Sequence, residues 1–317
     1  MTEKFERLEE VATALADNIG QVLVGKEHAV RLTLTGLFAG GHILLEDNPG
    51  TGKTSLAKSL AASIDGSVQR IQFTPDLLPG DITGVSIWNQ STGEFEFHPG
   101  PVIANVVLAD EINRASPKTQ SALLEVMQER RVTVDGVSHP APEPFLVIAT
   151  QNPIEQAGTY QLPEAQLDRF SLKTSIGYPD HATLVDILSK EDLLDASELE
   201  PVTTSAEILS LREVVDEVHA APAVIDYVVR LTEATRRAEE VRLGVSVRGA
   251  MAFLRSSRAY AALNGRDYVT PDDVKALASP SLAHRLILAP EAEFDGASPE
   301  SVIQQIVLES KPPRDRH

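Results

Sequence analysis

The sequence contains no cysteine, few aromatic residues and no long hydrophobic run. The lack of cysteine in 317 residues excludes disulfides and thiolate metal sites. Aromatic residues make up 5% of the chain and hydrophobic residues 42%, which is enough apolar material for one or two cores, so we expect two domains. The longest apolar stretch, around 102–109, is interrupted by Asn105 and is far shorter than a membrane span, so we expect no membrane insertion.

Basic residues are outnumbered by acidic ones. The chain has 28 Lys and Arg residues against 46 Asp and Glu residues, for a formal net charge of −18. Nucleic-acid-binding proteins normally present a basic face, so this charge argues against such a surface, although it leaves room for a local basic channel. The N-terminal sequence MTEKFERLEE is charged and amphipathic and lacks the apolar core of a signal peptide, so we expect a cytoplasmic protein.

The stretch GHILLEDNPGTGKT, residues 41–54, has the order strand, loop, helix that a phosphate-binding loop requires. Its glycines allow backbone N–H groups to turn toward a polyphosphate, and the start of the next helix adds its positive dipole. Lys53 can reach the outer phosphates of ATP, and the hydroxyl of Thr54 can bind Mg²⁺. The predicted nucleotide-binding residues of this loop are Pro49, Gly50, Thr51, Gly52, Lys53, Thr54 and Ser55.

One position departs from the pattern Gly-x-x-x-x-Gly-Lys-Ser/Thr. The first glycine is replaced by Asp47. A carboxylate aimed at the phosphates would repel them, at a cost of several kcal/mol for charges ~4 Å apart. We therefore expect Asp47 to shape the loop and to point away from the nucleotide.

Two further segments are candidates to complete a nucleotide site. Val24 and Gly25 stand about a helix's length before the loop, where backbone can lie against a base, although a Gly between apolar residues is usually only a turn. The apolar run of NVVLADEINRA ends in Asp110 and Glu111. At the carboxyl edge of a parallel sheet, Asp110 would bind Mg²⁺ and Glu111 would polarise the attacking water.

The strand PFLVIAT ends close to Asn152, which could cap a turn or hold the lytic water or the γ-phosphate. Arg169 follows the short helix predicted in LPEAQLDRF and could be an ordinary surface ion pair. Two β-hairpins are also predicted. One turns at 91–93, and the other turns at Asp135 and Gly136.

Strand and helix patterns alternate up to residue 179, which predicts a parallel α/β sheet covered on both faces. Beyond residue 179 only helical patterns remain. We therefore divide the chain into an α/β nucleotide-binding core, residues 1–179, and an all-helical domain, residues 180–317, that ends in a tail. The helices expected in the second domain cover about 180–190, 205–219, 222–240, 246–264 and 271–279.

Together these motifs resemble the MoxR family of AAA+ ATPases over nearly the whole chain. The glycine-rich loop resembles that family's Walker A region, and VVLADEINRASPKTQSALLEVMQER its Walker B region. IATQNP resembles its sensor 1, LPEAQLDRF its arginine-finger segment, and GVSVRGAMAFLRSSRAYAAL the sensor 2 helix of its lid. The combination of ADEINRA and LPEAQLDRF is more specific than the Walker motifs alone.

The resemblance implies an AAA+ core with the two hairpins as insertions and a helical lid. It implies that Glu111 is the catalytic base, that Asn152 is sensor 1, that Arg169 acts in trans on a neighbouring subunit, and that Arg248 acts in cis from the lid. It further implies ATP and Mg²⁺ as cofactors, a hexameric ring, a partner with a von Willebrand factor A domain, and a client protein complex that the ATPase remodels, matures or activates.

Two other functions stay open at this stage. The first is a nucleic-acid motor related to AAA+ helicases, which share the hairpin insertions but fit the charge of −18 poorly. The second is a nucleotide-gated scaffold that binds ATP and hardly hydrolyses it, against which the presence of Glu111, Asn152 and Arg169 argues.

Overall fold

The centre of the molecule is a parallel sheet of five strands in the order β2-β5-β8-β1-β9. The structure is a computed structural model, and it describes residues 3–152, 159–189 and 194–313. The two longer central strands, β5 and β8, are formed by apolar runs whose side chains are buried on both faces of the sheet. This confirms the predicted parallel α/β sheet. The strands are β1 (Ile43–Glu46), β2 (Val68–Gln72), β5 (Val106–Asp110), β8 (Leu146–Gln151) and β9 (Leu172–Thr174).

Successive residues of the strands pack into different cores. Val106 and Leu108 belong to the core on one face of the sheet, whereas Val107 and Ala109 belong to the core on the other. The first face is covered by α1 (Glu3–Gly20), α2 (Glu27–Phe38), α3 (Lys53–Ser63) and α8 (Ser205–Asp216). The second is covered by α4 (Pro79–Thr83), the short helix η1 (Ile112–Arg114) and α5 (Pro117–Glu129).

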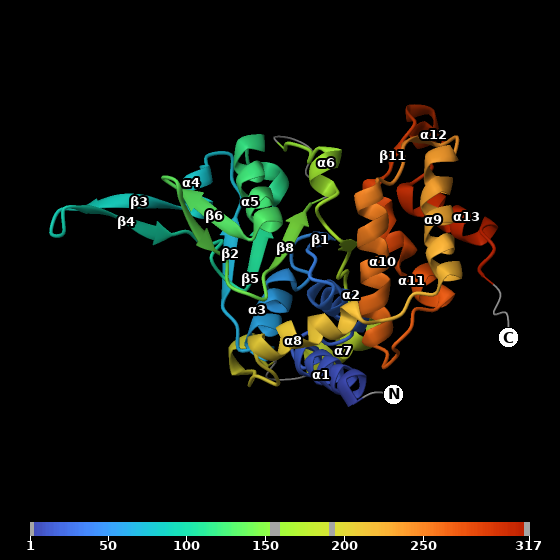
Figure 1. The fold of residues 1–317 in the computed structure, drawn as a ribbon, viewed down its shortest axis with the longest axis horizontal. Helices are drawn as coiled ribbons and strands as arrows, with labels where there is room; N and C mark the ends of the chain where they lie inside the picture. Colours follow the sequence, from blue (N-terminus) through green and yellow to red (C-terminus); the bar gives the residue numbers. More distant parts are fainter. Residues whose placement is uncertain (1–2, 153–158, 190–193, 314–317) are drawn as a thin grey trace.

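Both predicted hairpins are present. The second, β6 (Arg131–Val134) and β7 (Val137–Pro140), turns through Asp135 and Gly136, which both have positive φ, as such a two-residue turn requires. The first, β3 (Gly84–Asn89) and β4 (Glu94–Pro99), projects away from the core (Figure 1). It carries the exposed side chains of Trp88 and Phe95, whose rings meet edge to face.

The C-terminal part of the chain packs beside the core as a group of helices (Figure 1). The expectation that this part is wholly helical needs one correction, because β10 (Val241–Leu243) and β11 (Ile287–Leu288) form a short antiparallel pair. Two of its helices, α12 and α13, were not expected. Its helices are α9 (Pro222–Arg237), α10 (Val247–Ala262), α11 (Pro271–Leu282), η3 (Ala283–Arg285), α12 (Pro290–Phe294) and α13 (Pro299–Glu309).

Three short helices connect these parts: α6 (Glu164–Leu167), α7 (His181–Ser189) and η2 (Ala196–Glu198). Because α8 packs against α1 and α2 as well as against α10, the boundary at residue 180 stays a prediction. The expected tail after residue 313 lies outside the described residues. Within the described part of the chain, no helix combines the length and apolar character needed to cross a membrane.

Candidate active site

A cavity of about 450 Å³ opens at the carboxyl ends of β1, β2, β5 and β8. It brings together nine of the predicted site residues: Pro49, Gly50, Gly52, Lys53, Thr54, Ser55, Asp110, Glu111 and Asn152. Five residues that the sequence analysis did not assign to the nucleotide also line it: Asp47, Arg70, Gln72, Thr150 and Gln151. Segments far apart in the sequence therefore meet at one edge of the sheet, as expected for parallel strands.

The glycine-rich loop joins β1 to α3. Gly50 and Gly52 have φ values of 80° and 99°, a backbone conformation that other L-residues rarely adopt. Gly52 directly precedes α3, so Lys53 and Thr54 occupy the first turn, where free N–H groups favour an anion. The Lys53 ammonium donates to the main-chain oxygens of Asp47, at 3.2 Å, and Asn48, at 2.8 Å.

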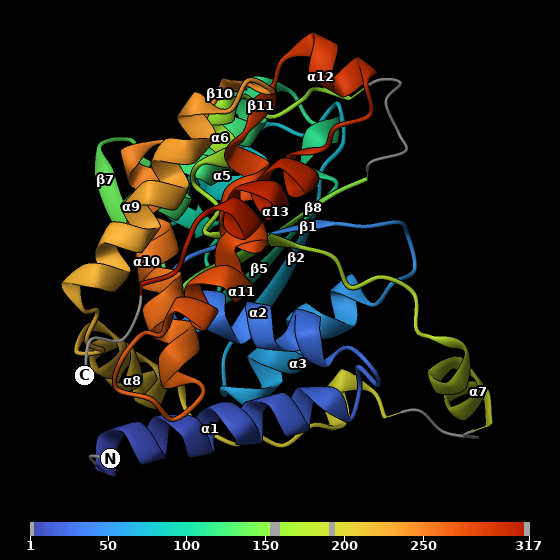
Figure 2. The ribbon, with the colours of Figure 1, turned by 90° about the vertical axis from the view of Figure 1, so that its right-hand side faces the viewer.

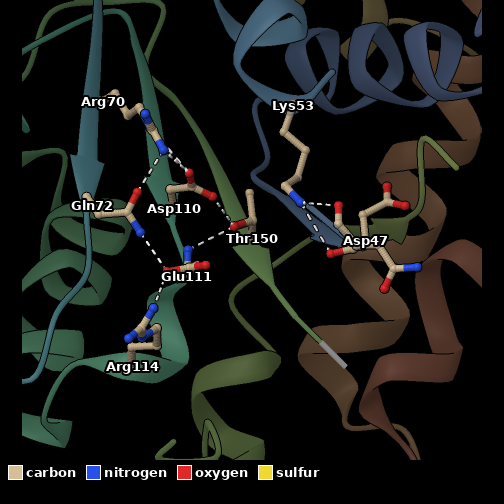
Figure 3. Close-up of polar contacts among 9 residues, drawn as sticks. Asp47, Lys53, Arg70, Gln72, Asp110, Glu111, Arg114 and Thr150 are labelled. Carbon is tan, nitrogen blue, oxygen red and sulfur yellow. Dashed lines mark hydrogen bonds and ion pairs between the residues drawn. The ribbon is translucent and has the colours of Figure 1, made fainter. Parts of the chain in front are cut away.

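Asp47 points away from this loop, as predicted. Its buried carboxylate accepts a hydrogen bond from the N–H of Gly177, at 3.1 Å, and another from the N–H of Ile176. Figure 3 shows Lys53 meeting main-chain oxygens while the carboxylate of Asp47 is directed elsewhere. The residue that replaces the first glycine therefore anchors the loop to the segment after β9.

Asp110 ends β5, Glu111 directly follows it, and both contact the hydroxyl of Thr150 on β8 (Figure 3). The Thr150 hydroxyl donates to Asp110 Oδ1 at 2.6 Å and accepts from the N–H of Glu111 at 2.8 Å. Glu111 itself is in the left-handed region, with φ 57° and ψ 49°. A non-glycine residue in that region is found mostly where the surroundings enforce it, often at functional sites.

Two side chains of the neighbouring strand β2 complete a closed ring of hydrogen bonds (Figure 3). The guanidinium of Arg70 donates to Asp110 Oδ2, with an Nη2–Oδ2 distance of 2.6 Å, and to Gln72 Oε1 at 2.7 Å. The Gln72 amide donates to Glu111 Oε2 at 2.7 Å. Glu111 Oε2 also accepts from Arg114 at 3.0 Å. Both acids are therefore held in place by neighbouring polar groups.

The donor set of this cavity fits a nucleotide-bound Mg²⁺. The hydroxyl of Thr54 and the carboxylate of Asp110 are oxygen ligands of the kind that Mg²⁺ prefers. Across residues 3–152, 159–189 and 194–313 no group of three or more His, Cys, Asp or Glu side chains could hold a metal ion. Nucleotide-bound Mg²⁺ typically takes only one or two protein ligands, with phosphate and water oxygens supplying the rest.

Three predicted binding residues lie outside the cavity lining. Thr51 is buried, and its hydroxyl donates to the main-chain oxygen of Asn48 at 3.3 Å. Val24 and Gly25 lie next to the loop, because their neighbour Leu23 is 3.5 Å from the position of a Cβ added to Gly52. A Cβ added to Gly25 would lie 2.8 Å from the side chain of Thr183, so α7 lies directly against this turn.

Arg169 and Arg248 lie close together on a different surface. Burial and the nearby charge of Arg248 lower the pKa of Arg169, while Glu125 and Glu129 act in the opposite direction. Arg169 donates to the main-chain oxygen of Leu124. Among the described residues neither arginine forms an ion pair.

The predicted action of Arg248 in cis stays a prediction, because Arg248 does not line the cavity around Lys53 in this structure. Arg248 lines a separate pocket with Ser171, Met251 and other residues, and is not part of the cavity around Lys53. In Figure 2 the loop from β1 to α3 lies on the right, whereas α6, α9 and α10 lie to the left. The sequence could not supply this position, because it depends on how the lid docks on the core.

A buried ion pair fixes that docking. Asp168 accepts from the buried guanidinium of Arg285 at 2.7 Å and from the hydroxyl of Ser246 at 2.8 Å. Gly249 makes room for Arg285, since a Cβ there would lie 2.7 Å from Arg285 Cδ. These contacts join the residue before Arg169 to the start of the helix that carries Arg248.

Comparison with known proteins agrees with this architecture. Residues 42–172 match the family described as ATPase family associated with various cellular activities (AAA), and residues 233–306 match the AAA lid domain. The chain is 50% identical to the uncharacterized protein YeaC of Bacillus subtilis over 95% of this chain and 94% of the relative. It is 43% identical to chaperone MoxR1 of Mycobacterium tuberculosis over 91% of this chain and 79% of that relative.

The same agreement holds for a solved structure. A crystal structure from Cytophaga hutchinsonii, whose name proposes an ATPase, superposes with a TM-score of 0.90 and 39% identity. The superposition covers 98% of each chain, so core and lid are arranged alike in the two proteins.

Proposed function

The chain belongs to the MoxR family of AAA+ ATPases, and from this membership we propose that it hydrolyses ATP with Mg²⁺ to remodel, mature or activate partner protein complexes. The observation that carries the proposal is the meeting of Lys53, Asp110 and Glu111 around one cavity. A lysine, a metal-binding acid and a second acid beside them are the parts that phosphoryl transfer to water needs.

Each of these residues has a separate task. Lys53 would exchange the main-chain oxygens that it now contacts for the outer phosphates of the nucleotide. Thr54 and Asp110 would hold Mg²⁺, which neutralises phosphate charge when bound. Glu111 would take a proton from the attacking water, and Asn152, at the end of β8, would position that water.

The first test separates binding from hydrolysis. We expect Lys53→Ala to weaken ATP binding about tenfold or more, because a charged hydrogen bond to ground-state phosphate is lost. Glu111→Gln should keep binding and lose about a hundredfold or more in kcat, because Gln accepts no proton. Nucleotide titration and phosphate release measure the two effects, with Glu94→Gln on the exposed hairpin strand β4 as a control. Wild-type turnover by Glu111→Gln would refute the assignment of the base.

Arg169 and Arg248 are proposed to act together on the nucleotide of a neighbouring subunit. Their shared position away from their own cavity, and the lack of an ion-pair partner for either among the described residues, support this role. A pair of cations that form no ion pair among the described residues fits an anionic group brought by another chain. Action in trans requires a ring, for which we propose six subunits.

The names of the relatives support partners that are proteins. One relative is named a chaperone, and others are named magnesium-chelatase subunits. We propose a client protein complex and a partner with a von Willebrand factor A domain. Salt-dependent binding to single- and double-stranded DNA would favour the nucleic-acid motor instead. ATP binding without measurable turnover would favour the nucleotide-gated scaffold.

A further inference from the structure

Arg70 touches the residue proposed to bind Mg²⁺, yet neither the glycine-rich loop nor the acidic pair includes it. It lies on β2, the edge strand beside β5, with its side chain 52% exposed. Two of its nitrogens approach the same oxygen, since Asp110 Oδ2 lies 3.2 Å from Nε and 2.6 Å from Nη2. Arg70 also lines the cavity around Lys53.

Both oxygens of the Asp110 carboxylate accept hydrogen bonds from protein groups. Oδ1 accepts from the Thr150 hydroxyl at 2.6 Å, and Oδ2 accepts from Arg70. The side chain of Asp110 is only 12% exposed, so a partly buried negative charge is balanced here by a guanidinium. Any further cation that approaches Oδ2 meets the positive charge of Arg70 within a few ångströms.

We infer that Arg70 takes the place of the metal at Asp110, so that the bound metal ion and the Arg70 guanidinium compete for Oδ2. This inference rests on the proposed function of the cavity. Arg70 is thus a positioning residue, which holds the Asp110 carboxylate in its orientation until the Mg²⁺-nucleotide arrives. Because half of its side chain is exposed, Arg70 can leave without breaking the core.

The departure of Arg70 also reaches the proposed base. Arg70 Nη2 is the donor to Gln72 Oε1, and the amide of Gln72 in turn holds Glu111 Oε2. When Arg70 leaves Asp110, the Gln72 amide loses the contact that orients it. The same exchange that admits the metal therefore loosens the contact on Glu111, which links metal arrival to release of the base.

The test measures competition directly. A fluorescent, non-hydrolysable ATP analogue is held at fixed concentration while Mg²⁺ is titrated from an EDTA-buffered start, and the half-saturating Mg²⁺ concentration is recorded. Arg70→Met should lower this concentration by about two- to fivefold, which is the range that one largely exposed ion pair contributes. Arg70→Lys keeps the positive charge and should stay closer to the wild type.

Arg114→Met is the matched control. Arg114 is 42% exposed and pairs with Glu111 at 3.0 Å instead of with Asp110. Its substitution should leave the half-saturating Mg²⁺ concentration unchanged. In EDTA without nucleotide, Arg70→Met should also lower the unfolding temperature more than Arg114→Met, because Asp110 then lacks its balancing charge.

The outcomes separate the two proposals. A wild-type protein that shows no Mg²⁺-dependent nucleotide binding would overturn the proposed function and this inference together. Normal wild-type binding with an unchanged or higher half-saturating Mg²⁺ concentration in Arg70→Met would overturn the inference alone. In the second case Arg70 would be a phosphate ligand or a structural ion pair.

Discussion

The hydroxyl of Thr150 shows how single residues at this site serve two neighbours at once. It donates to the carboxylate of Asp110 and accepts from the N–H of Glu111, whose backbone is in the left-handed conformation. A valine has the same shape but would leave the buried carboxylate oxygen and the N–H of Glu111 without that partner. The strained backbone of Glu111 therefore depends on a hydroxyl supplied by another strand.

His42 is a buried residue whose protonation state matters for stability. Its Nδ1 accepts from the N–H of Val147 at 3.0 Å, and its Nε2 lies 3.1 Å from the oxygen of Met127. This arrangement requires the neutral ring. Burial, together with the charges of Arg130 and Arg212, lowers the pKa of His42 from 6.5 to about 4.

We therefore predict an acid-sensitive core. The unfolded chain takes up a proton at His42 near pH 6.5 and the folded protein only near pH 4, so stability from this group is fully present above pH 6.5 and is lost as the pH falls toward 4. The difference corresponds to roughly 3 kcal/mol. Denaturant unfolding at pH 7.5, 6 and 5 measures it.

The matched variants are His42→Leu and His28→Gln. We expect His42→Leu to lower the free energy of unfolding at pH 7.5. Between pH 6.5 and 4, the free energy of unfolding of this variant should fall less than that of the wild type. His28 lies exposed on α2, and its substitution should keep the wild-type pH profile. Equal slopes for wild type and His42→Leu would show that other groups cause the acid sensitivity.

The site residues that the sequence revealed are those with a fixed local pattern. Lys53, Thr54, Asp110 and Glu111 follow apolar runs at recognisable spacings, and the structure brings them to one cavity. Arg70 and Gln72 were missed because no functional residue was predicted in the segment that forms β2. Their alternation on a strand next to β5 places both on the same side, near the acids, and that signal was available.

At the scale of elements, hydrogen bonds connect the glycine-rich loop to the segment after β9. Asp47 binds the N–H groups of Ile176 and Gly177, while Lys26 donates to the oxygen of Gly177 at 2.8 Å. The chain that leaves the sheet toward α7 is thus held from two sides. Changes in the loop that accompany nucleotide binding would reach this segment directly.

Asp47→Ala tests that connection. Two N–H groups would lose their acceptor, so we expect the free energy of unfolding to fall by about 2 to 4 kcal/mol. ATP affinity should not rise, because the carboxylate does not face the phosphates. Asp47→Asn keeps one acceptor oxygen and should cost less. A tenfold or larger gain in ATP affinity in Asp47→Ala would show that the carboxylate faces the nucleotide after all.

Helices and strands were predicted correctly where the hydrophobic pattern extended over many residues or where the turn contained residues typical of one turn type. The sheet, both hairpins and five helices of the second domain follow such patterns. The pair of β10 and β11 was missed because strands of three and two residues carry no readable alternation. The surroundings of Arg248 could not be predicted, because they depend on the Asp168–Arg285 contact, between residues 117 positions apart in the chain.

At the scale of the whole molecule, two surfaces of opposite character stand apart. One is the nucleotide cavity with its acids, and the other carries Arg169 and Arg248 without ion-pair partners among the described residues. In a chain with a net charge of −18, two adjacent unpaired arginines are conspicuous. A head-to-tail ring would place the arginine surface of one subunit against the cavity of the next.

Mixed rings test this arrangement. We expect Arg169→Ala and Arg248→Ala each to lose most ATPase activity, and each to recover when mixed with Glu111→Gln chains, which keep both arginines. Random mixing at equal amounts should restore roughly a quarter of the wild-type interfaces. Activity of the wild type should also rise with protein concentration as rings form.

Lys53→Ala mixed with Glu111→Gln is the negative control, because both lesions lie in the same cavity and no interface in such a ring is complete. Rescue of Arg169→Ala without rescue of Arg248→Ala would return Arg248 to a role in its own chain. Failure of both, in rings whose assembly is verified by light scattering, would mean that neither arginine acts across the interface. Rescue of both Arg169→Ala and Arg248→Ala would show that each arginine acts from the neighbouring subunit. In such mixed rings, the chain that supplies Lys53 and Glu111 to a working cavity lacks one arginine, so the neighbour must supply it.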